Sequence, residues 1–340
     1  MSTTTASLAQ EPDTGPAERT ETAAEIAARS PLQLFWRRLK KDWLALTALI
    51  IVVLVVLVAL LAPVIVNVAG TADPLVQSSD LTGDFGEPLG PNAVASSPSS
   101  DGTIAQAGPF GSDKLGRDVF SRTVYGSRIS LIVAFIATSI TVLVGVTLGL
   151  LAGYYRGWVD TALTRVMDLM LAFPVLVLAI GVGVACSGTE GCLGGTIKPG
   201  LTVVIFVISV STWPYMARIV RGQVLSLREK EFVEASKSLG ASDGRIIFKE
   251  ILPNLVAPII VYSTVLIPTN ILFEAALSFL GVGIEAGIPS WGAMIADAAP
   301  GFREAWWYMT FPGVALLVTV LAFNLVGDGL QDALNPRTAK

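Results

Sequence analysis

The chain has 340 residues, of which 52% are hydrophobic and only 15% are charged. Soluble globular proteins carry about 25% charged residues, so this composition indicates a membrane protein. The sequence contains 0 His and 2 Cys, which excludes a Ser-His-Asp triad and a zinc site of His and Cys ligands. We therefore expect no catalytic residue and no metal site. The net charge of -4 gives no general basic surface for nucleic acid.

Six apolar segments are long enough to cross a bilayer, because a spanning helix needs roughly 20 apolar residues. They lie at 43–66, 129–155, 169–189, 199–217, 251–273 and 305–327. No segment alternates polar and apolar residues as a transmembrane barrel strand does. The predicted fold class is an all-α integral membrane protein with six transmembrane helices.

The placement of Lys and Arg predicts how these helices are oriented. With the N-terminus inside, 17 of the 23 Lys and Arg residues fall in inner segments, as the positive-inside rule requires. Both termini are therefore expected to be cytoplasmic. The predicted parts are a partly disordered tail at 1–42, a first transmembrane helix at 43–66, an extracytoplasmic loop at 67–127, a core of five transmembrane helices at 128–327 and a tail at 328–340.

The predicted extracytoplasmic loop is long and rich in Gly, Pro, Ser and Asp from Gly83 to Gly108, which is typical of a flexible excursion. Its last part, 111–122, predicts a short amphipathic helix at the outer membrane face, with an ordinary turn before the next helix as the alternative. A phosphate loop is excluded there, because Arg117 and Asp118 stand where Lys and Ser or Thr are needed. We expect the chain itself to bind no cofactor.

Cys186 and Cys192 lie in the second predicted outer loop. In an oxidising exterior they would form a disulfide of structural importance, and otherwise they would remain two free thiols near the membrane surface.

The predicted inner loop, 219–254, has the pattern of a helix–turn–helix elbow between the fourth and fifth transmembrane helices. Phe232, Ala235 and Leu239 recur at helical intervals. Gly240 is expected to end the first helix, and Pro253 to end the second. Acidic residues on the elbow disfavour binding to an anionic membrane surface. A partner protein is therefore the predicted ligand of the elbow.

Several stretches resemble one known family. The run Glu234-Ala235-Ser236-x3-Gly240, continuing to Leu252-Pro253, is similar to the EAA loop of ABC-importer permeases. Further stretches resemble the second, C-type permease of the dipeptide, oligopeptide and nickel branch. These are 30–39, 116–122 with 125–128, 168–174, 273–281 and 289–292. The resemblance runs from about residue 30 to the end, with three departures. Ser236 replaces the second Ala of the triplet, Glu250 stands where the family often shows His, and the outer loop is longer than usual, with Gly83 to Gly108 as the expected insertion.

This resemblance implies a permease subunit of an ATP-driven importer, forming half of the path for peptides or a related solute such as nickel. It implies a second permease subunit, one or two ABC ATPase subunits that bind ATP and Mg, an extracytoplasmic substrate-binding protein, and a place among the lipids of the bacterial inner membrane. The elbow becomes the coupling element for the ATPase. Its implied coupling residues are Phe232, Glu234, Ala235, Ser236, Leu239 and Gly240. The substrate stays open among dipeptides, longer peptides, nickel complexes and some glycosides.

Gly145, Gly149 and Gly153 share one face of the second transmembrane helix. Glycines at this spacing allow helices to approach closely. Two interpretations follow: packing within the chain, or a seam with the second permease.

Two acids lie in or near the membrane, where an isolated charge is costly. Asp168 is close to the inner boundary and can pair with Arg165. Glu274 lies deeper, so it either lines the translocation path or fixes an inter-helix hydrogen bond. An ion-coupled secondary transporter is the alternative function. It would need inverted repeats and ionisable groups near the midplane, and only Glu274 is suitably placed.

Overall fold

The computed structural model describes residues 40, 42–83, 86–96, 104–186, 188, 191–192, 194–197, 200–283 and 287–334. Nearly all of the predicted N-terminal tail lies outside the described residues, as do 335–340. Within the described ranges the regular elements are helices, and β structure is limited to isolated bridges. The all-α prediction is confirmed for this part of the chain.

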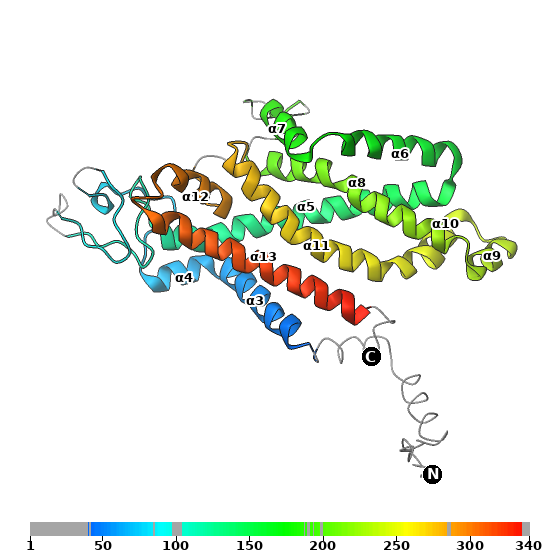
Figure 1. The fold of residues 1–340 in the computed structure, drawn as a ribbon, viewed down its shortest axis with the longest axis horizontal. Coiled ribbons are helices and arrows are strands. Elements are labelled where there is room, and N and C mark those ends of the chain that lie inside the picture. The colour runs from blue at the N-terminus through cyan, green and yellow to red at the C-terminus, as the bar shows by residue number, and fades with distance from the viewer. Residues whose placement is uncertain are drawn as a thin grey trace, which may run out of the picture.

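The longer helices run in the same general direction, along the long axis of the molecule (Figure 1). In chain order the elements are α3 (Trp43–Leu60), α4 (Ala62–Ala69), η1 (Ser79–Leu81), α5 (Val119–Tyr155), α6 (Gly157–Ala172), α7 (Val175–Cys186), α8 (Leu201–Leu227), α9 (Glu231–Ser238), α10 (Asp243–Arg245), the π-helical η2 (Ile246–Ile251), α11 (Leu252–Phe279), α12 (Trp291–Ala298), η3 (Ala299–Gly301) and α13 (Trp306–Leu334). We call the end that carries α9 and α10 the elbow end. The opposite end, with α12 and the described residues between 70 and 118, is the loop end.

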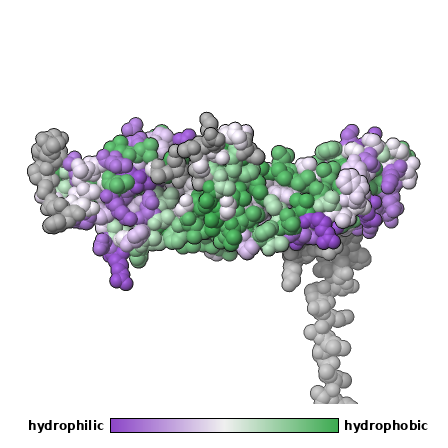
Figure 2. Space-filling view, turned by 90° about the horizontal axis from the view of Figure 1, so that it is seen from above, coloured by the Kyte–Doolittle hydropathy of each residue, from purple (hydrophilic) through white to green (hydrophobic). Residues whose placement is uncertain are grey.

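Within the described part of the chain, five helices are long and apolar enough to cross a membrane, and the number rises to six when the bent pair α6 and α7 is taken as one span. The five are Trp43–Leu60, Val119–Tyr155, Leu201–Leu227, Asp243–Phe279 and Trp306–Leu334. Figure 2 shows a broad apolar zone in the middle of the molecule with polar residues toward both ends. This arrangement agrees with the predicted set of six.

The third predicted span differs from expectation because it is two helices bent by 89°. The break falls at Phe173, whose backbone is extended (φ -83, ψ 138), and at Pro174. Proline lacks a backbone N–H and disfavours helical geometry in the residue before it. The inner part, α6, begins at Gly157, well before the predicted apolar segment.

The amphipathic helix predicted over 111–122 does not form. Helix α5 begins only at Val119, and the residues before it are turns in which Gly111 and Gly116 have φ of 78° and 66°. Asp118 caps α5, accepting a hydrogen bond from the Ser121 backbone N–H at 2.7 Å. Burial raises the pKa of this carboxyl. The segment is therefore the folded entry to α5 and not a surface helix.

The second helix of the elbow also differs from expectation, because Pro253 does not end it. Helix α10 continues through η2 into α11, so one helical span covers Asp243–Phe279. In the π-helical turn, the Leu252 backbone N–H bonds to the Ile247 carbonyl, five residues back. Pro253 follows in the first turn of α11, where a missing N–H costs little.

Close packing of α5 on α8 forms the centre of the bundle. A Cβ added to Gly145 would lie 2.7 Å from the Met216 Cβ, and one added to Gly149 would lie 2.6 Å from the Ala217 carbonyl oxygen. One added to Gly153 would lie 2.6 Å from the Val224 Cβ. These glycines therefore pack within the chain, and the alternative of a seam with a second permease is wrong.

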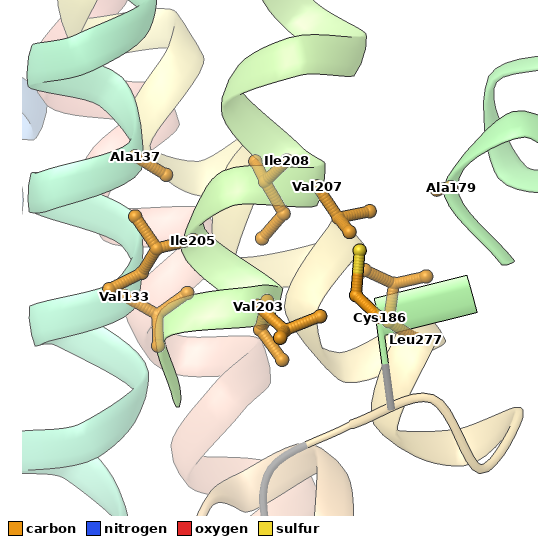
Figure 3. Close-up of a cluster of buried hydrophobic side chains, with 10 residues drawn as sticks. Val133, Ala137, Ala179, Cys186, Val203, Ile205, Val207, Ile208 and Leu277 are labelled. Carbon is orange, nitrogen blue, oxygen red and sulfur yellow. The ribbon is translucent and has the colours of Figure 1, made fainter. Parts of the chain in front are cut away.

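Toward the loop end, a buried apolar cluster joins α5, α7, α8 and α11 (Figure 3). It includes Val133, Ala137, Ala179, Cys186, Val203, Val204, Ile205, Val207, Ile208 and Leu277. The cluster attaches the short helix α7 to the bundle after the bend at Pro174.

The predicted outer boundaries of the helical region are approximate. The first predicted helix, 43–66, is α3 followed by α4, which meet at Leu61. The C-terminal tail predicted at 328–340 is partly helical, since α13 continues to Leu334.

Candidate functional site

The elbow presents exposed apolar side chains at the tip of the molecule. Leu239 is 88% exposed, Phe248 is 65% exposed and Phe232 is 39% exposed. Helix α9 and helix α10 lie at the end of the molecule, away from the middle of the bundle (Figure 1). The six predicted coupling residues all lie on α9 or the turn after it, and all but the half-buried Ser236 are exposed: Phe232, Glu234, Ala235, Ser236, Leu239 and Gly240. Apolar groups gathered at such a place are typical of a protein-binding surface.

The turn that follows α9 is closed by hydrogen bonds of the helix itself. The Ala241 N–H bonds to the Ser236 carbonyl at 3.1 Å, and the Gly240 N–H bonds to the Lys237 carbonyl at 3.0 Å. This pair is a Schellman motif, which requires a left-handed residue after the helix. Gly240 supplies it with φ of 78°. The predicted role of Gly240 in ending the first helix is therefore confirmed.

Val233 anchors α9 to the rest of the chain, and sequence reasoning missed it. It is the buried residue of α9, at 3% exposure, and it packs in one cluster with Ile246, Ile247 and Ile251 of η2. The sequence analysis took Phe232, Ala235 and Leu239 as the apolar face of this helix, but the structure leaves Phe232 partly exposed. The sequence signal that could have identified Val233 is the apolar pair Ile246 and Ile247 of η2, because these side chains need an apolar partner on α9.

Polar contacts from the end of α5 hold both halves of the elbow. The Tyr154 hydroxyl donates a hydrogen bond to Asp243 Oδ1 at 2.7 Å. Arg228 donates to the Tyr154 carbonyl, and its guanidinium lies 5.9 Å from the centre of the Tyr154 ring. Arg156 pairs with Glu229 in the turn between α8 and α9. The α5–α6 turn is therefore the base on which the elbow rests.

Helix α6 is held to α8 by ion pairs and by an apolar cluster. Asp160 accepts two hydrogen bonds from Arg221, at 2.5 and 2.9 Å. Asp168 pairs with Arg218 at 2.7 Å, so the predicted partner Arg165 is wrong. Met167 is the buried residue of α6. It packs in one cluster with Trp213 and Ala217 of α8, so both polar and apolar contacts attach α6.

A cleft of about 650 Å³ lies between the elbow and its base. Side chains of both charges line it, together with two tyrosines. They are Tyr154, Tyr155, Arg156, Arg228, Glu229, Val233, Glu234, Lys237 and Asp243. Mixed charge of this kind suits a polar rim around the exposed apolar tip.

Glu274 lies inside the bundle and has no exposed surface in this chain. Its carboxylate accepts hydrogen bonds from the Ser130 hydroxyl at 3.1 Å and the Ser278 hydroxyl at 2.8 Å. The Ser130 oxygen also accepts a hydrogen bond from the Trp291 backbone N–H at 3.3 Å. Glu274 therefore links α5 and α11 near the start of α12. Its geometry fits the inter-helix alternative and not a residue lining an open path.

The structure joins Cys186 and Cys192 by a disulfide, with their Cα atoms 4.8 Å apart. The bond closes a short loop after α7. Cys186 also belongs to the apolar cluster of Figure 3, so the loop is anchored to the bundle at that residue.

An apolar groove of about 340 Å³ runs between α8 and α11. It is lined by Val175, Thr212, Tyr215, Met216, Ile219, Tyr262, Val265, Leu266, Thr269 and Phe273. Tyr215 is 47% exposed and Tyr262 is 38% exposed. Aromatic side chains of this kind offer both an apolar surface and a hydroxyl group to a partner or solute.

The bundle, its bent span and its exposed elbow define a multi-pass membrane protein that has the fold of an ABC-transporter membrane subunit. Among solved structures, the inward-facing MetNI methionine ABC transporter shares this fold with a TM-score of 0.52. That match has 20% identity and covers 63% of this chain and 96% of that chain.

The sequence comparisons define the family. Residues 145–340 match the binding-protein-dependent transport system inner membrane component, and residues 30–80 match the N-terminal TM domain of oligopeptide transport permease C. The chain belongs to the family of binding-protein-dependent transport system inner membrane components, the permease subunits of ABC importers. The resemblance found in the sequence is therefore confirmed.

Three relatives illustrate the relationship. The dipeptide transport system permease protein DppC of Alkalihalophilus pseudofirmus is 40% identical over 97% of this chain and 96% of its own length. DppC of Bacillus subtilis is 38% identical over 89% of this chain and 84% of its own. The glutathione transport system permease protein GsiD of Pectobacterium atrosepticum is 42% identical over 67% of this chain and 72% of its own.

Proposed function

We propose that this permease subunit carries small peptides, dipeptides first, and forms half of their path through the inner membrane. The support is the similarity to two dipeptide permeases along most of the chain and to a glutathione permease. Glutathione is itself a tripeptide, so these relatives share a peptide chemistry. Nickel complexes and glycosides have no comparable support among them.

The coupling elbow carries the second part of the proposal. The exposed side chains of Leu239, Phe232 and Phe248 insert in an apolar cleft of an ABC ATPase subunit, and the charged residues around them form the rim. The single observation that carries this is Leu239, 88% exposed at a helix end with nothing in the chain to cover it among the described residues. Burial of such a leucine contributes about 1.5–3 kcal/mol.

The proposal also includes the other partners of the chain and its orientation in the membrane. ATP and Mg bind to the ATPase subunits, and this chain contributes no catalytic group. The elbow end and both termini are cytoplasmic, and the loop end meets an extracytoplasmic substrate-binding protein. A second permease covers the groove between α8 and α11, where half-exposed tyrosines face away from the bundle core. The ion-coupled alternative depends on Glu274, whose carboxyl is enclosed by the serines described above.

The test is uptake by proteoliposomes that contain the chain, the second permease and the ATPase subunits. Leu239→Asp should lower binding-protein-dependent dipeptide uptake at least tenfold, since about 1.4 kcal/mol of docking energy is a factor of ten. Val68→Asp is the matched control, because Val68 is 83% exposed at the opposite end. Its uptake should stay within about twofold of wild type. Normal uptake by Leu239→Asp would contradict the docking proposal.

A further inference from the structure

An ion cluster is buried at the loop end, where α5 begins. Asp113 is 0% exposed, Arg122 is 1% exposed and Arg117 is 5% exposed. Asp118 is a second buried acid in this segment, 2% exposed, and its Oδ1 has no hydrogen-bond partner among the described residues. Asp297 of α12 also faces the cluster, with its carboxylate 3.8 Å from Arg117 Nη2, but its side chain is 55% exposed and accepts a hydrogen bond from the Tyr308 hydroxyl.

The hydrogen bonds of Asp113 leave Arg122 without a full partner. Asp113 Oδ1 accepts from the backbone N–H groups of Leu115 and Arg117, both at 2.9 Å. Asp113 Oδ2 accepts from Arg117 Nε at 2.6 Å. Arg122 Nε stands 3.6 Å from the same oxygen and has no hydrogen-bond partner among the described residues. An unpaired donor on a buried cation is costly and calls for an anion or water.

Both arginines line one cavity of about 540 Å³ between the entry to α5, the segment after α11, and α12. Its other walls are Asp297, the larger Gln77, Leu115 and Ile288, and six small residues: Ser278, Gly281, Gly283, Gly287, Ala293 and Ala296. Arg122 reaches the far wall, donating from Nη1 to the Gly287 carbonyl at 3.3 Å and to the Pro74 carbonyl at 3.1 Å. The cavity thus combines open space with an unpaired N–H donor on a buried arginine, and the Asp297 carboxylate lines it as well.

We propose that this cavity binds a carboxylate, held by the guanidinium groups of Arg117 and Arg122. Guanidinium groups bind carboxylates through charge-assisted, often bidentate hydrogen bonds. The inference rests on the proposed function for the source of the anion. That source is the C-terminal carboxylate of the peptide as it leaves the binding protein, or an acidic side chain of the binding protein itself. Both supply the same chemistry at the extracytoplasmic mouth.

The first arm of the test measures binding of labelled Ala-Ala and of its C-terminal amide. It uses the complete complex of both permeases and ATPase subunits in nanodiscs, without binding protein. The free acid should bind at least roughly tenfold more tightly than the amide, because only the acid offers the anion. Ala296→Leu fills the cavity without altering the ion cluster, and it should abolish this preference. Arg117→Gln should do the same, and Arg303→Gln, which removes an exposed cation, should not.

The second arm measures the concentration of binding protein that half-saturates stimulation of ATP hydrolysis. An acid-to-amide preference assigns the site to the peptide. Equal binding of acid and amide, with a half-saturating concentration raised about tenfold by Arg117→Gln and by Ala296→Leu but not by Arg303→Gln, assigns it to an acidic side chain of the binding protein. If neither arm responds, the proposal is overturned.

Two further results keep the interpretation separate from other causes. Glu285, which lies outside the described residues, could supply the chain's own carboxylate to this site. If only a Glu285→Gln variant, and not the wild type, binds the acid more tightly than the amide, the Glu285 carboxylate fills the site. That result overturns the proposal. Copurification of the ATPase subunits reports on the proposed function independently. If these subunits are present and stimulated while neither arm responds, only the carboxylate site has failed.

Discussion

The two ends of this permease are built from similar residue types in opposite ways. At the loop end, Asp113, Arg117 and Arg122 are buried against backbone groups and one another. At the elbow end, Asp168 and Arg218 form a pair that is about half exposed, and Leu239 points away from the chain. The difference indicates that the loop end is a fixed frame, whereas the elbow end leaves apolar surface open, as the proposed docking requires.

The loop end is rigid because separating its buried charges costs much free energy. Leaving one buried charge unpaired costs several kcal/mol, whereas an exposed pair can open in water at almost no cost. Because the chain bends at Pro174, α6 lies nearer the elbow end and α7 lies nearer the loop end.

The largest effect is expected where α5 and α8 connect the two ends. Gly149→Leu places side-chain atoms against the Ala217 carbonyl, which is backbone and cannot move aside. Overpacking costs about 1–3 kcal/mol where neighbouring side chains can yield, and more where the contacted atom is backbone, as it is here. The variant should fail to yield folded protein, judged by size-exclusion chromatography in detergent. The matched control is Gly222→Leu on α8, where an added Cβ meets nothing within 4 Å, and a similar loss there would contradict the packing account.

The next prediction compares one acid from each end. Asp113→Asn leaves two buried arginines without their acid, which costs about 3–5 kcal/mol. Asp168→Asn breaks a half-exposed pair with Arg218, which costs about 0–1 kcal/mol. The apparent melting temperature in detergent should fall strongly for the first variant and little for the second. Equal losses would remove the distinction between the two ends.

An intermediate effect is expected from the disulfide after α7. Cys186→Ser with Cys192→Ser opens a loop with a sequence separation of 6, and closure of such a short loop contributes about 2 kcal/mol. The loss should be confined to the loop end. Copurification of the ATPase subunits should therefore be unchanged, and loss of these subunits in the double variant would contradict this separation.

The smallest effect should come from a change that keeps a hydrogen-bond network. Glu274→Gln retains an amide oxygen to accept from Ser130 or Ser278, so thermal stability and uptake should stay near wild type. Glu274→Ala leaves buried serine hydroxyls without their acceptor, at about 1–3 kcal/mol. Abolished uptake by a stable Glu274→Gln protein would show that the charge has a role in transport.

The sequence predicted the features that depend on local pattern. Uncharged stretches between charged residues locate the membrane-crossing helices, and Gly240 ends α9 as expected. The bend at Pro174 was missed because the apolar run continues through it. Pro253 was misread because the π-helical turn before it depends on packing of Ile246 and Ile247.

The missed parts of the site depend on contacts between distant residues. Asp168 finds Arg218, 50 residues away, rather than its neighbour Arg165. Arg122 reaches Gly287, which is 165 residues away in the chain. A periodic pattern carries no information about such pairs. The amphipathic character predicted for 111–122 came from the very charges that the structure buries.

The central claim is that Leu239 docks on an ATPase subunit, and thiol cross-linking tests it most directly. The 2 Cys of the chain are joined in a disulfide, so Leu239→Cys introduces the single free thiol for a photoactivatable maleimide. After illumination of the assembled importer, the account predicts a covalent product between this chain and the ATPase subunit. Val68→Cys, exposed at the opposite end, should give none. Absence of the product from Leu239→Cys in an intact, ATP-hydrolysing complex would contradict the account.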